Sequence, residues 1–287
     1  MEGLKLSHIH DCKYLFLKAA FIIITIFAVY SPAMDGGFIW DDNKYVTENS
    51  LRMTPDGLKR IWFSTDVPSQ YFPLTYTTFW LEYKLWGLNP TGYHIVNIAL
   101  HTINALLVWL LLSRLSVPGA WLASAIFALH PVHVESVAWI TERKNVLSCL
   151  FYLLAIAAWL KFIAKSASGS WKYYFLTILL YLLALFSKTT AVTLPAALLA
   201  IYWFKERRVE WKAVFYVIPF IVLGLIMGLI TMWWEYHHQG TQGKEFAFSA
   251  MERIIIASRA LWFYPYKLIW PTSLTFSYPR WELNPTN

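Results

Sequence analysis

Long apolar segments recur along this chain of 287 residues, and they constrain its fold more than any other feature. A helix that crosses the hydrocarbon core of a bilayer needs roughly 20 consecutive apolar residues. Eight segments approach this pattern, so membrane spans would occupy about 160 positions of the chain. We expect these spans at about 14–30, 93–112, 119–129, 145–160, 173–186, 191–204, 214–234 and 254–270.

Composition excludes the other broad classes of protein. The chain is 57% hydrophobic and only 14% charged, which is too apolar for a soluble domain of this length. The net charge of +7 does not indicate nucleic-acid binding, because the basic residues form no long run or aromatic-interleaved stripe. Cys12 and Cys149 lie in different settings, so neither a disulfide framework nor a thiolate metal site is expected. We therefore predict an all-α integral membrane protein, a polytopic helical bundle forming a single transmembrane domain over residues 1–287.

A long non-spanning segment, about 35–92, follows the first span and should form the first external loop. Within it, Pro55–Phe63 and Tyr71–Trp86 mix aromatic and charged residues. Such segments suit helices that lie in the membrane interface rather than crossing it.

The distribution of Lys and Arg predicts the orientation. With the N-terminus in the cytoplasm, the cytoplasmic pieces are 1–18, 111–118, 161–172 and 205–212. They hold eleven Lys and Arg against four Asp and Glu, whereas the rest of the chain holds thirteen of each. This asymmetry follows the positive-inside rule. It also puts Asp41, Asp42, the segment 130–144 and Lys188 on the same, non-cytoplasmic side.

The acid pair Asp41-Asp42 follows the first span within Phe38–Tyr45. Neighbouring carboxylates repel, so one should have a raised pKa while the other stays ionised. On an extended backbone the two side chains would point oppositely, and only one would face a substrate. An ionised Asp there can act as a general base toward a hydroxyl. The alternative is a structural role in helix capping or interfacial solvation.

Three cations of the same side could bind a phosphate: Arg143 bidentately, and Lys144 and Lys188 as point charges. Alternatively, Arg143 and Lys144 are anchors that extend from the end of a span to the interface. Lys188 is harder to explain in that way, because it lies in a short polar break between two apolar runs.

His130 and His133, with Glu135, raise the question of a metal site. Their spacing is not that of a zinc protease, and no third ligand is evident, so we expect no metal although a divalent ion stays an alternative. Pro131 would begin a helix with His130 at its cap. If that helix continued, Glu135, Trp139 and Glu142 would share one face. The polar stripe of Asn97, His101 and Asn104 should face the bundle, as hydrogen-bonding side chains between helices or as part of a site.

A base, cations and aromatic interfacial segments on one side fit a reaction between a lipid-linked phosphate and a hydroxyl acceptor. Two alternatives remain open at this point. A transporter or flippase could use intramembrane His, Asn and Asp as a relay, although no inverted repeat is visible. A non-catalytic membrane scaffold could use the acid pair structurally.

Several motifs resemble one family. Trp40-Asp41-Asp42 resembles the acidic signature of GT-C glycosyltransferases, which use polyprenyl-phosphate sugars. The matching segments are Gly92–Asn97 with His101, His130–Ala138, Glu142–Leu147 and Ser187-Lys188. Together they resemble the membrane part of the transmembrane and tetratricopeptide-repeat O-mannosyltransferases, over about 38–287. Tyr278–Trp281 is similar to bacterial relatives, which favours the bacterial inner membrane over the endoplasmic reticulum.

This resemblance implies a hexosyltransferase that moves a mannose-like sugar from a polyprenyl-phosphate donor to a protein Ser or Thr, with no certain cofactor and no nucleic-acid partner. It implies that Asp41 is the base and Asp42 its partner. Donor phosphate and sugar would be bound by a second set of residues, namely His133, Glu135, Arg143, Lys144 and Lys188. Supporting positions would be His101, His130 and Tyr45.

The chain departs from the family pattern in two ways. No 34-residue repeat is present, so we expect the N-terminal part of a longer architecture. Phe72 stands where eukaryotic members often have Arg before Pro-Leu, which leaves the identity of the donor open.

Overall fold

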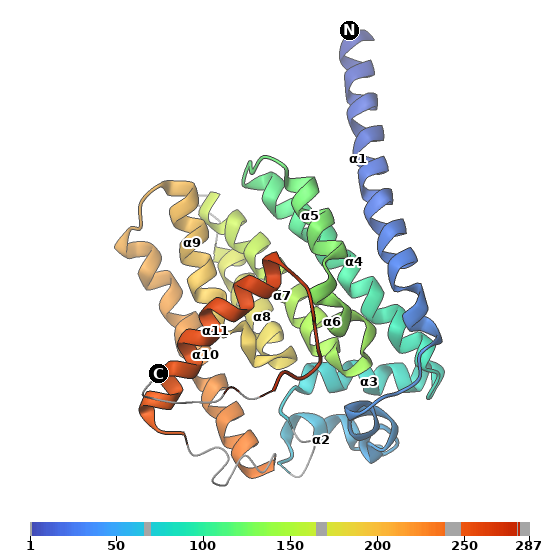
Figure 1. Ribbon diagram of the computed structural model, residues 1–287. Coiled ribbons are helices and arrows are strands. Elements are labelled where there is room, and N and C mark those ends of the chain that lie inside the picture. The colour runs from blue at the N-terminus through green and yellow to red at the C-terminus, as the bar shows by residue number, and fades with distance from the viewer. Residues whose placement is uncertain (1, 66–69, 165–170, 239–247, 280, 282–287) are drawn as a thin grey trace.

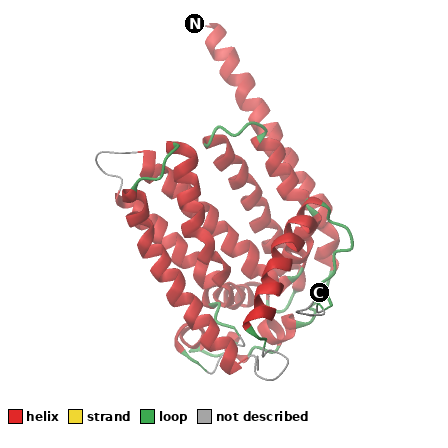
Figure 2. Ribbon diagram, turned by 60° about the vertical axis from the view of Figure 1, so that its left-hand side comes forward, coloured by secondary structure: helices red, strands yellow, loops and turns green. Residues whose placement is uncertain are grey.

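The computed structural model describes residues 2–65, 70–164, 171–238, 248–279 and 281. Over these residues the chain is helical and contains no strand (Figures 1 and 2). The helices at the eight expected spans are α1 (Glu2–Tyr30), α4 (Pro90–Arg114), α5 (Ala120–Leu129), α7 (Arg143–Ala164), α8 (Trp171–Ser187), α9 (Leu194–Glu206), α10 (Trp211–His238) and α11 (Ala250–Ile269). The all-α prediction is confirmed for the described part of the chain.

Four of these segments are long and apolar enough to cross a membrane, which fits an integral membrane protein. They are Lys13–Asp35, Pro90–Arg114, Ile140–Ala164 and Trp211–His238. Helix α5 has only 10 residues and α8 has 17. At 1.5 Å per residue α5 covers about 15 Å, half of a hydrocarbon core of roughly 30 Å. The number of eight spans is therefore not established.

Helix α11 does not have the character of the eighth span that we expected. It begins with a capping box in which Ser249 and Glu252 bind each other's backbone N–H, and none of its residues is buried. Charged residues recur along it, among them Arg253, Arg259 and Lys267. A helix with this pattern suits a position along an interface more than a crossing.

Three apolar clusters hold the bundle together. The largest joins α7, α8, α9 and α10 around Trp159, Tyr181 and Phe220. A second packs α1 and α4 through Ile26 and Ile98. The third lies under the first loop and is rich in aromatic residues: Tyr45, Phe72, Tyr76, Phe79 and Tyr93.

The first loop contains the two helices that its composition predicts, α2 (Gly57–Phe63) and α3 (Pro73–Trp86). Pro73 at the first position of α3 has a φ already suited to a helix. Helix α3 ends at Gly87, where φ is +63°. Asn89 caps the start of α4, because its side chain accepts a hydrogen bond from the N–H of Thr91.

The two ends of the bundle differ. Figure 1 shows the start of α1, the turn between α4 and α5 and the link between α9 and α10 at the upper end. The first loop with α2 and α3 lies at the opposite end. The link around 165–170, which was also expected at the basic end, lies outside the described residues.

The chain between α5 and α7 is broken into three short pieces, so the continuous helix on which a shared face of Glu135, Trp139 and Glu142 depended does not form. The pieces are a 3₁₀ turn at Pro131–His133, α6 (Val134–Ala138) and a second 3₁₀ turn at Ile140–Glu142. Trp139 has an extended backbone between them, so Glu135, Trp139 and Glu142 do not share a helix face. The amide of Asn97 donates to the carbonyls of Trp139 (3.0 Å) and Ile140 (3.4 Å), which satisfies polar groups that the break exposes.

Candidate functional site

The acid pair lies on a tight turn. The N–H of Asp42 donates to the carbonyl of Ile39 at 2.9 Å, and the N–H of Ile39 donates to Asp42 Oδ2, also at 2.9 Å. Trp40 occupies the left-handed region with φ +48°. As a result Asp41 is exposed while Asp42 is fully buried. The two side chains do face different surroundings, but because of this turn rather than an extended backbone.

Asp42 connects the turn to a distant part of the chain. Its Oδ1 accepts a hydrogen bond from the N–H of Thr141 at 2.9 Å, across 99 positions. Burial raises the pKa of Asp42, while the two backbone donors act in the opposite direction. The physical cause is therefore desolvation and not the charge of Asp41, as repulsion within the pair would have required.

A cluster of charges begins at the next residue, Glu142. Lys144 forms an ion pair with Glu142 at 2.8 Å, and Lys188 approaches the same carboxylate at 3.9 Å. Asn145 joins them, because its amide donates to Glu142 at 2.6 Å and its Oδ1 accepts from Lys188. Burial lowers the pKa of Lys188, although Glu142 counteracts this. Glu135 lies at the exposed edge, where burial and then Glu142 raise its pKa.

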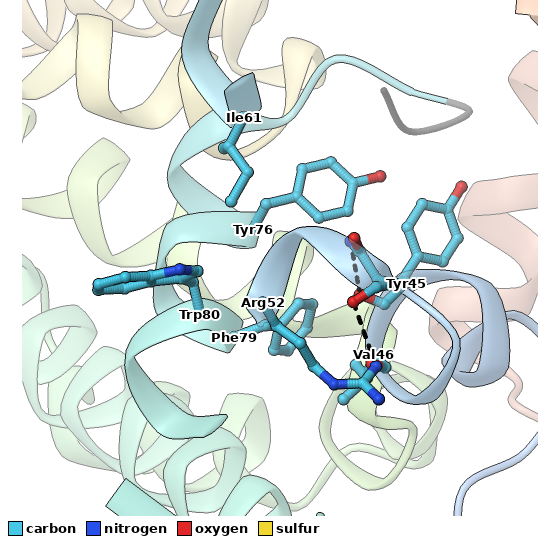
Figure 3. A pocket seen from close by; sticks show the side chains of 8 residues that line it. Tyr45, Val46, Arg52, Ile61, Tyr76, Phe79 and Trp80 are labelled. Atoms are coloured by element: carbon cyan, nitrogen blue, oxygen red, sulfur yellow. Dashed lines mark hydrogen bonds between the residues drawn. The ribbon is translucent and has the colours of Figure 1, made fainter. Parts of the chain in front are cut away.

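This cluster lies beside the acid pair and Tyr45. Lys144 Nζ lies 5.9 Å from the centroid of the Tyr45 ring, which stacks on Tyr76 at 5.5 Å. The Tyr45 hydroxyl donates to Gln70 at 3.3 Å. Figure 3 shows Tyr45 and Tyr76 around a small cavity of about 10 Å³, roughly the space of one water. The sequence expectation that Asp41, Asp42, Lys144 and Lys188 lie at one end of the bundle agrees with this geometry.

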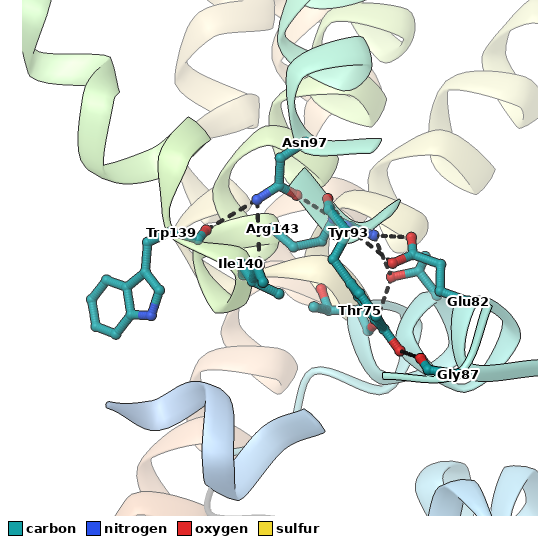
Figure 4. A network of polar contacts seen from close by, with 9 residues as sticks. Thr75, Glu82, Gly87, Tyr93, Asn97, Trp139, Ile140 and Arg143 are labelled. Carbon is teal, nitrogen blue, oxygen red and sulfur yellow. Dashed lines mark hydrogen bonds and ion pairs between the residues drawn. The ribbon is translucent and has the colours of Figure 1, made fainter. Parts of the chain in front are cut away.

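Arg143 lies apart from the two lysines, inside the protein. It is fully buried and forms an ion pair with Glu82 of α3, and its Nη2 donates to the carbonyl of Tyr93 at 2.9 Å (Figure 4). Its Nε donates to Asn97 Oδ1. The N–H groups of the guanidinium thus bind other groups of the protein, and these contacts hold α3, α4 and α7 together.

Glu82 is the residue that sequence reasoning missed. It lies in a segment read only as interfacial, and its distance from Arg143 along the chain gave no sign of the pairing. The signal that could have found it is its position as the one acid of α3, because a buried carboxylate requires a cation.

The polar stripe of α4 joins helices. Asn104 donates to the carbonyl of Val146 at 2.8 Å, and His101 Nε2 to that of Ala128 at 3.0 Å. With Asn97, all three are buried and bind backbone carbonyls of other segments. Of the two interpretations, hydrogen bonding between helices describes their contacts.

His130 and His133 form a cluster of rings with His101. His133 lies 5.3 Å from His101 and 6.4 Å from His130, measured between ring centroids. His130 caps the turn that begins at Pro131, as expected: its Nδ1 accepts from the N–H of Val132 at 3.2 Å. Its Nε2 therefore carries the proton and donates to the carbonyl of Leu268 at 2.8 Å. In the described residues no three His, Cys, Asp or Glu side chains gather in a way that could hold a metal ion.

Comparison with known proteins identifies relatives of the chain. It is 34% identical over 178 residues to Protein O-mannosyl-transferase Tmtc1 of Drosophila melanogaster, covering 58% of this chain and 20% of that protein. It is 34% identical over 155 residues to Protein O-mannosyl-transferase F38B6.6 of Caenorhabditis elegans, covering 49% and 22%. Protein O-mannosyl-transferase TMTC2 of Mus musculus is 27% identical over 222 residues, covering 72% and 27%.

The chain thus spans about a fifth to a quarter of the length of these relatives. No family model matches it, and no solved structure matches it. These three relatives are animal proteins, so they give no support to the expected bacterial inner membrane. The sequence relationship confirms the resemblance that the motifs indicated, because the chain is similar to O-mannosyl-transferases of the TMTC family at 27–34% identity.

Proposed function

We propose that this chain is the membrane part of a protein O-glycosyltransferase of GT-C type. It transfers a mannose-like sugar from a polyprenyl-phosphate donor to a Ser or Thr hydroxyl of a protein. The relatives are named protein O-mannosyl-transferases, which supports this reaction class. The reaction takes place on the non-cytoplasmic face, with the N-terminus in the cytoplasm, as the distribution of Lys and Arg favours.

The observation that carries the proposal is the hydrogen bond between Thr141 N–H and Asp42. It holds the acid turn against the segment that bears Glu142 and Lys144, so an exposed carboxylate and two cations occupy one end of the molecule. A transfer between a hydroxyl and a phosphate ester needs both kinds of group within reach of the same substrate pair.

Each group has a role in the reaction. Asp41 accepts the proton of the acceptor hydroxyl while the hydroxyl oxygen forms a bond to the anomeric carbon of the sugar. The bond between that carbon and the phosphate oxygen breaks, and the phosphate leaves with the electron pair. Lys188 and Lys144 stabilise the negative charge of the leaving phosphate. Attack opposite to the leaving group inverts the anomeric carbon.

Asp42 and Arg143 act through other groups. Both carboxylate oxygens of Asp42 accept hydrogen bonds from backbone N–H groups, and Asp42 thereby positions Asp41. Arg143 holds α3 against α7 through Glu82 and positions the start of the helix that bears Lys144. His133 and Glu135 border the cluster and are candidates to contact the sugar of the donor, with His101, His130 and Tyr45 as supports.

The substitution Asp41→Asn tests the base. We expect transfer of sugar from polyprenyl phosphate to an acceptor peptide to fall about 10²- to 10⁴-fold, because general-base catalysis supplies that range. The matched control is Asp35→Asn, an exposed acid upstream in the same loop, which should retain activity. Full activity of the Asp41 variant would refute the assignment.

The two alternatives predict different results with the same preparation. A transporter or flippase would move a lipid-linked or small polar substrate across liposomes without transferring sugar. A scaffold would lose stability in alanine variants of Asp41 and Lys188 without any enzymatic deficit.

A further inference from the structure

An apolar groove runs between α9 and α10, away from the acid pair. Its volume is about 710 Å³, within the range of about 300–1,000 Å³ of small-molecule sites. Every residue along it is apolar, including Val192, Pro195, Ala196, Leu199, Gly224 and Gly228. Nothing in the reaction described above uses it.

Small residues create this space. Gly228 has no neighbouring atom within 4 Å of the position where a Cβ would lie, so the groove is open there. Gly224, one turn earlier, is different: a Cβ would come within 2.6 Å of the Tyr181 hydroxyl. Gly224 thus serves packing between helices, whereas Gly228 leaves a gap that a ligand can fill.

The groove opens to the outside of the bundle. Leu225 and Leu229 on its α10 side are each 64% exposed, and Met232 is 67% exposed. Helix α10 is one of the four segments able to cross a membrane. An occupant would therefore enter from the apolar part of the bilayer, which selects for a lipid chain rather than a water-soluble molecule.

One end of the groove lies close along the chain to Lys188, a member of the cation cluster. Val192 belongs to the 3₁₀ turn Thr189–Thr193, which follows Lys188 directly. At the same level the hydroxyls of Thr189 and Thr231 are 2.6 Å apart, and the next residue, Met232, lines the groove. The apolar groove thus ends within about one helical turn of Lys188.

We infer that this groove holds the first isoprene units of a polyprenyl phosphate, with the phosphate at Lys188. This inference rests on the proposed function and locates its donor lipid. The groove alone would take any apolar chain, and Lys188 alone would bind any anion. The groove between α9 and α10 ends close to Lys188, and this arrangement matches an apolar chain that ends in a phosphate. The α10 part of the groove, from Ile221 to Met232, is about 16 Å long at 1.5 Å per residue. It therefore covers about half of the hydrocarbon core, so the rest of the chain lies in lipid.

Photolabelling tests the inference. The full chain in nanodiscs is exposed to a polyprenyl phosphate that carries a diazirine in its second isoprene unit. We expect labelled peptides from 192–199 and 221–232. Unlabelled polyprenyl phosphate should suppress labelling, whereas the same concentration of phosphatidic acid or inorganic phosphate should not.

Gly228→Leu should reduce labelling about tenfold, equivalent to ~1.4 kcal/mol, because the Cβ position is open and the added side chain fills part of the groove. The matched control is Ala123→Leu, a small-to-large change at an exposed position of α5 outside the groove. This control variant should be photolabelled to the same extent as the unaltered chain. Both variants are checked for a single size-exclusion peak and an unchanged Tm.

Labelling elsewhere, undiminished labelling of the Gly228 variant, or equal competition by phosphatidic acid would each overturn the inference. The last result would make the groove a site for ordinary membrane lipid. Asp41→Asn separates this inference from the proposed function, because it should abolish transfer yet leave labelling intact. If that variant keeps full activity, the base assignment fails while the groove stands.

Discussion

At the scale of single residues, the neighbouring acids Asp41 and Asp42 have different roles because of the turn that runs from Ile39 to Asp42. A left-handed conformation costs roughly 1–2 kcal/mol for a residue other than glycine, and Trp40 adopts one. Two hydrogen bonds from backbone N–H groups to the Asp42 carboxylate offset this cost. The strained residue thus directly precedes the proposed base, where local strain often accompanies function.

The histidine cluster predicts a dependence of stability on pH. Burial, followed by the nearby His101 and His130, lowers the pKa of His133 to about 4. In the unfolded chain it is about 6.5, so between these values the unfolded state binds more protons and stability falls as pH falls. When the pH falls from 7 to 5, the free energy of unfolding should decrease in both proteins. We expect this decrease to be about 1–2 kcal/mol smaller for His133→Gln than for the unaltered chain, measured by denaturant titration in mild detergent.

The control for this measurement is His237→Gln, an exposed histidine near the end of α10. It should leave the pH dependence unchanged. If the His133 variant loses as much stability as the unaltered chain on acidification, His133 is not the group responsible.

At the scale of elements, sequence patterns predicted what depends on local chemistry. The eight apolar segments are helices, the first loop contains two helices, and His130 caps its turn. The break at Trp139 could not be predicted, because the amide that stabilises it comes from Asn97, 42 positions away. The partner of Arg143 was missed for the same reason. The chemistry assigned to each candidate residue stays a prediction.

The ion pair of Glu82 and Arg143 predicts how α3 is attached to α7. Glu82→Leu leaves a buried guanidinium without its counter-charge, so we expect a loss of about 3–5 kcal/mol in free energy of unfolding. The double variant with Arg143→Met removes that charge and should recover part of the loss. SDS titration followed by tryptophan fluorescence measures both.

Lys84→Leu is the control, because it removes an exposed charge from the same helix. It should change stability by about 0.5 kcal/mol or less. A Glu82 variant as stable as this control would show that the ion pair contributes nothing to holding α3.

At the scale of the whole molecule, charge and chemistry separate along the bundle. The links between α4 and α5 and between α9 and α10, both expected in the cytoplasm, lie at one end, and the first loop, which carries the acid turn, lies at the other (Figure 1). The sequence predicted this separation because each span reverses the side of the chain. It could not predict how many helices cross completely, since α5 and α8 are short and their depth depends on neighbouring helices.

The proposed orientation predicts which positions are accessible from each side. In a chain whose Cys12 and Cys149 are replaced by serine, single cysteines are placed at Ser116 and Ser50, both exposed and at opposite ends of the bundle. In sealed cells a membrane-impermeant maleimide should label Ser50→Cys, and should label Ser116→Cys only after permeabilisation. The reverse pattern would place the acid turn in the cytoplasm, contrary to the positive-inside rule. Labelling of both from one side would mean that α4 does not cross the membrane, which would require a different bundle.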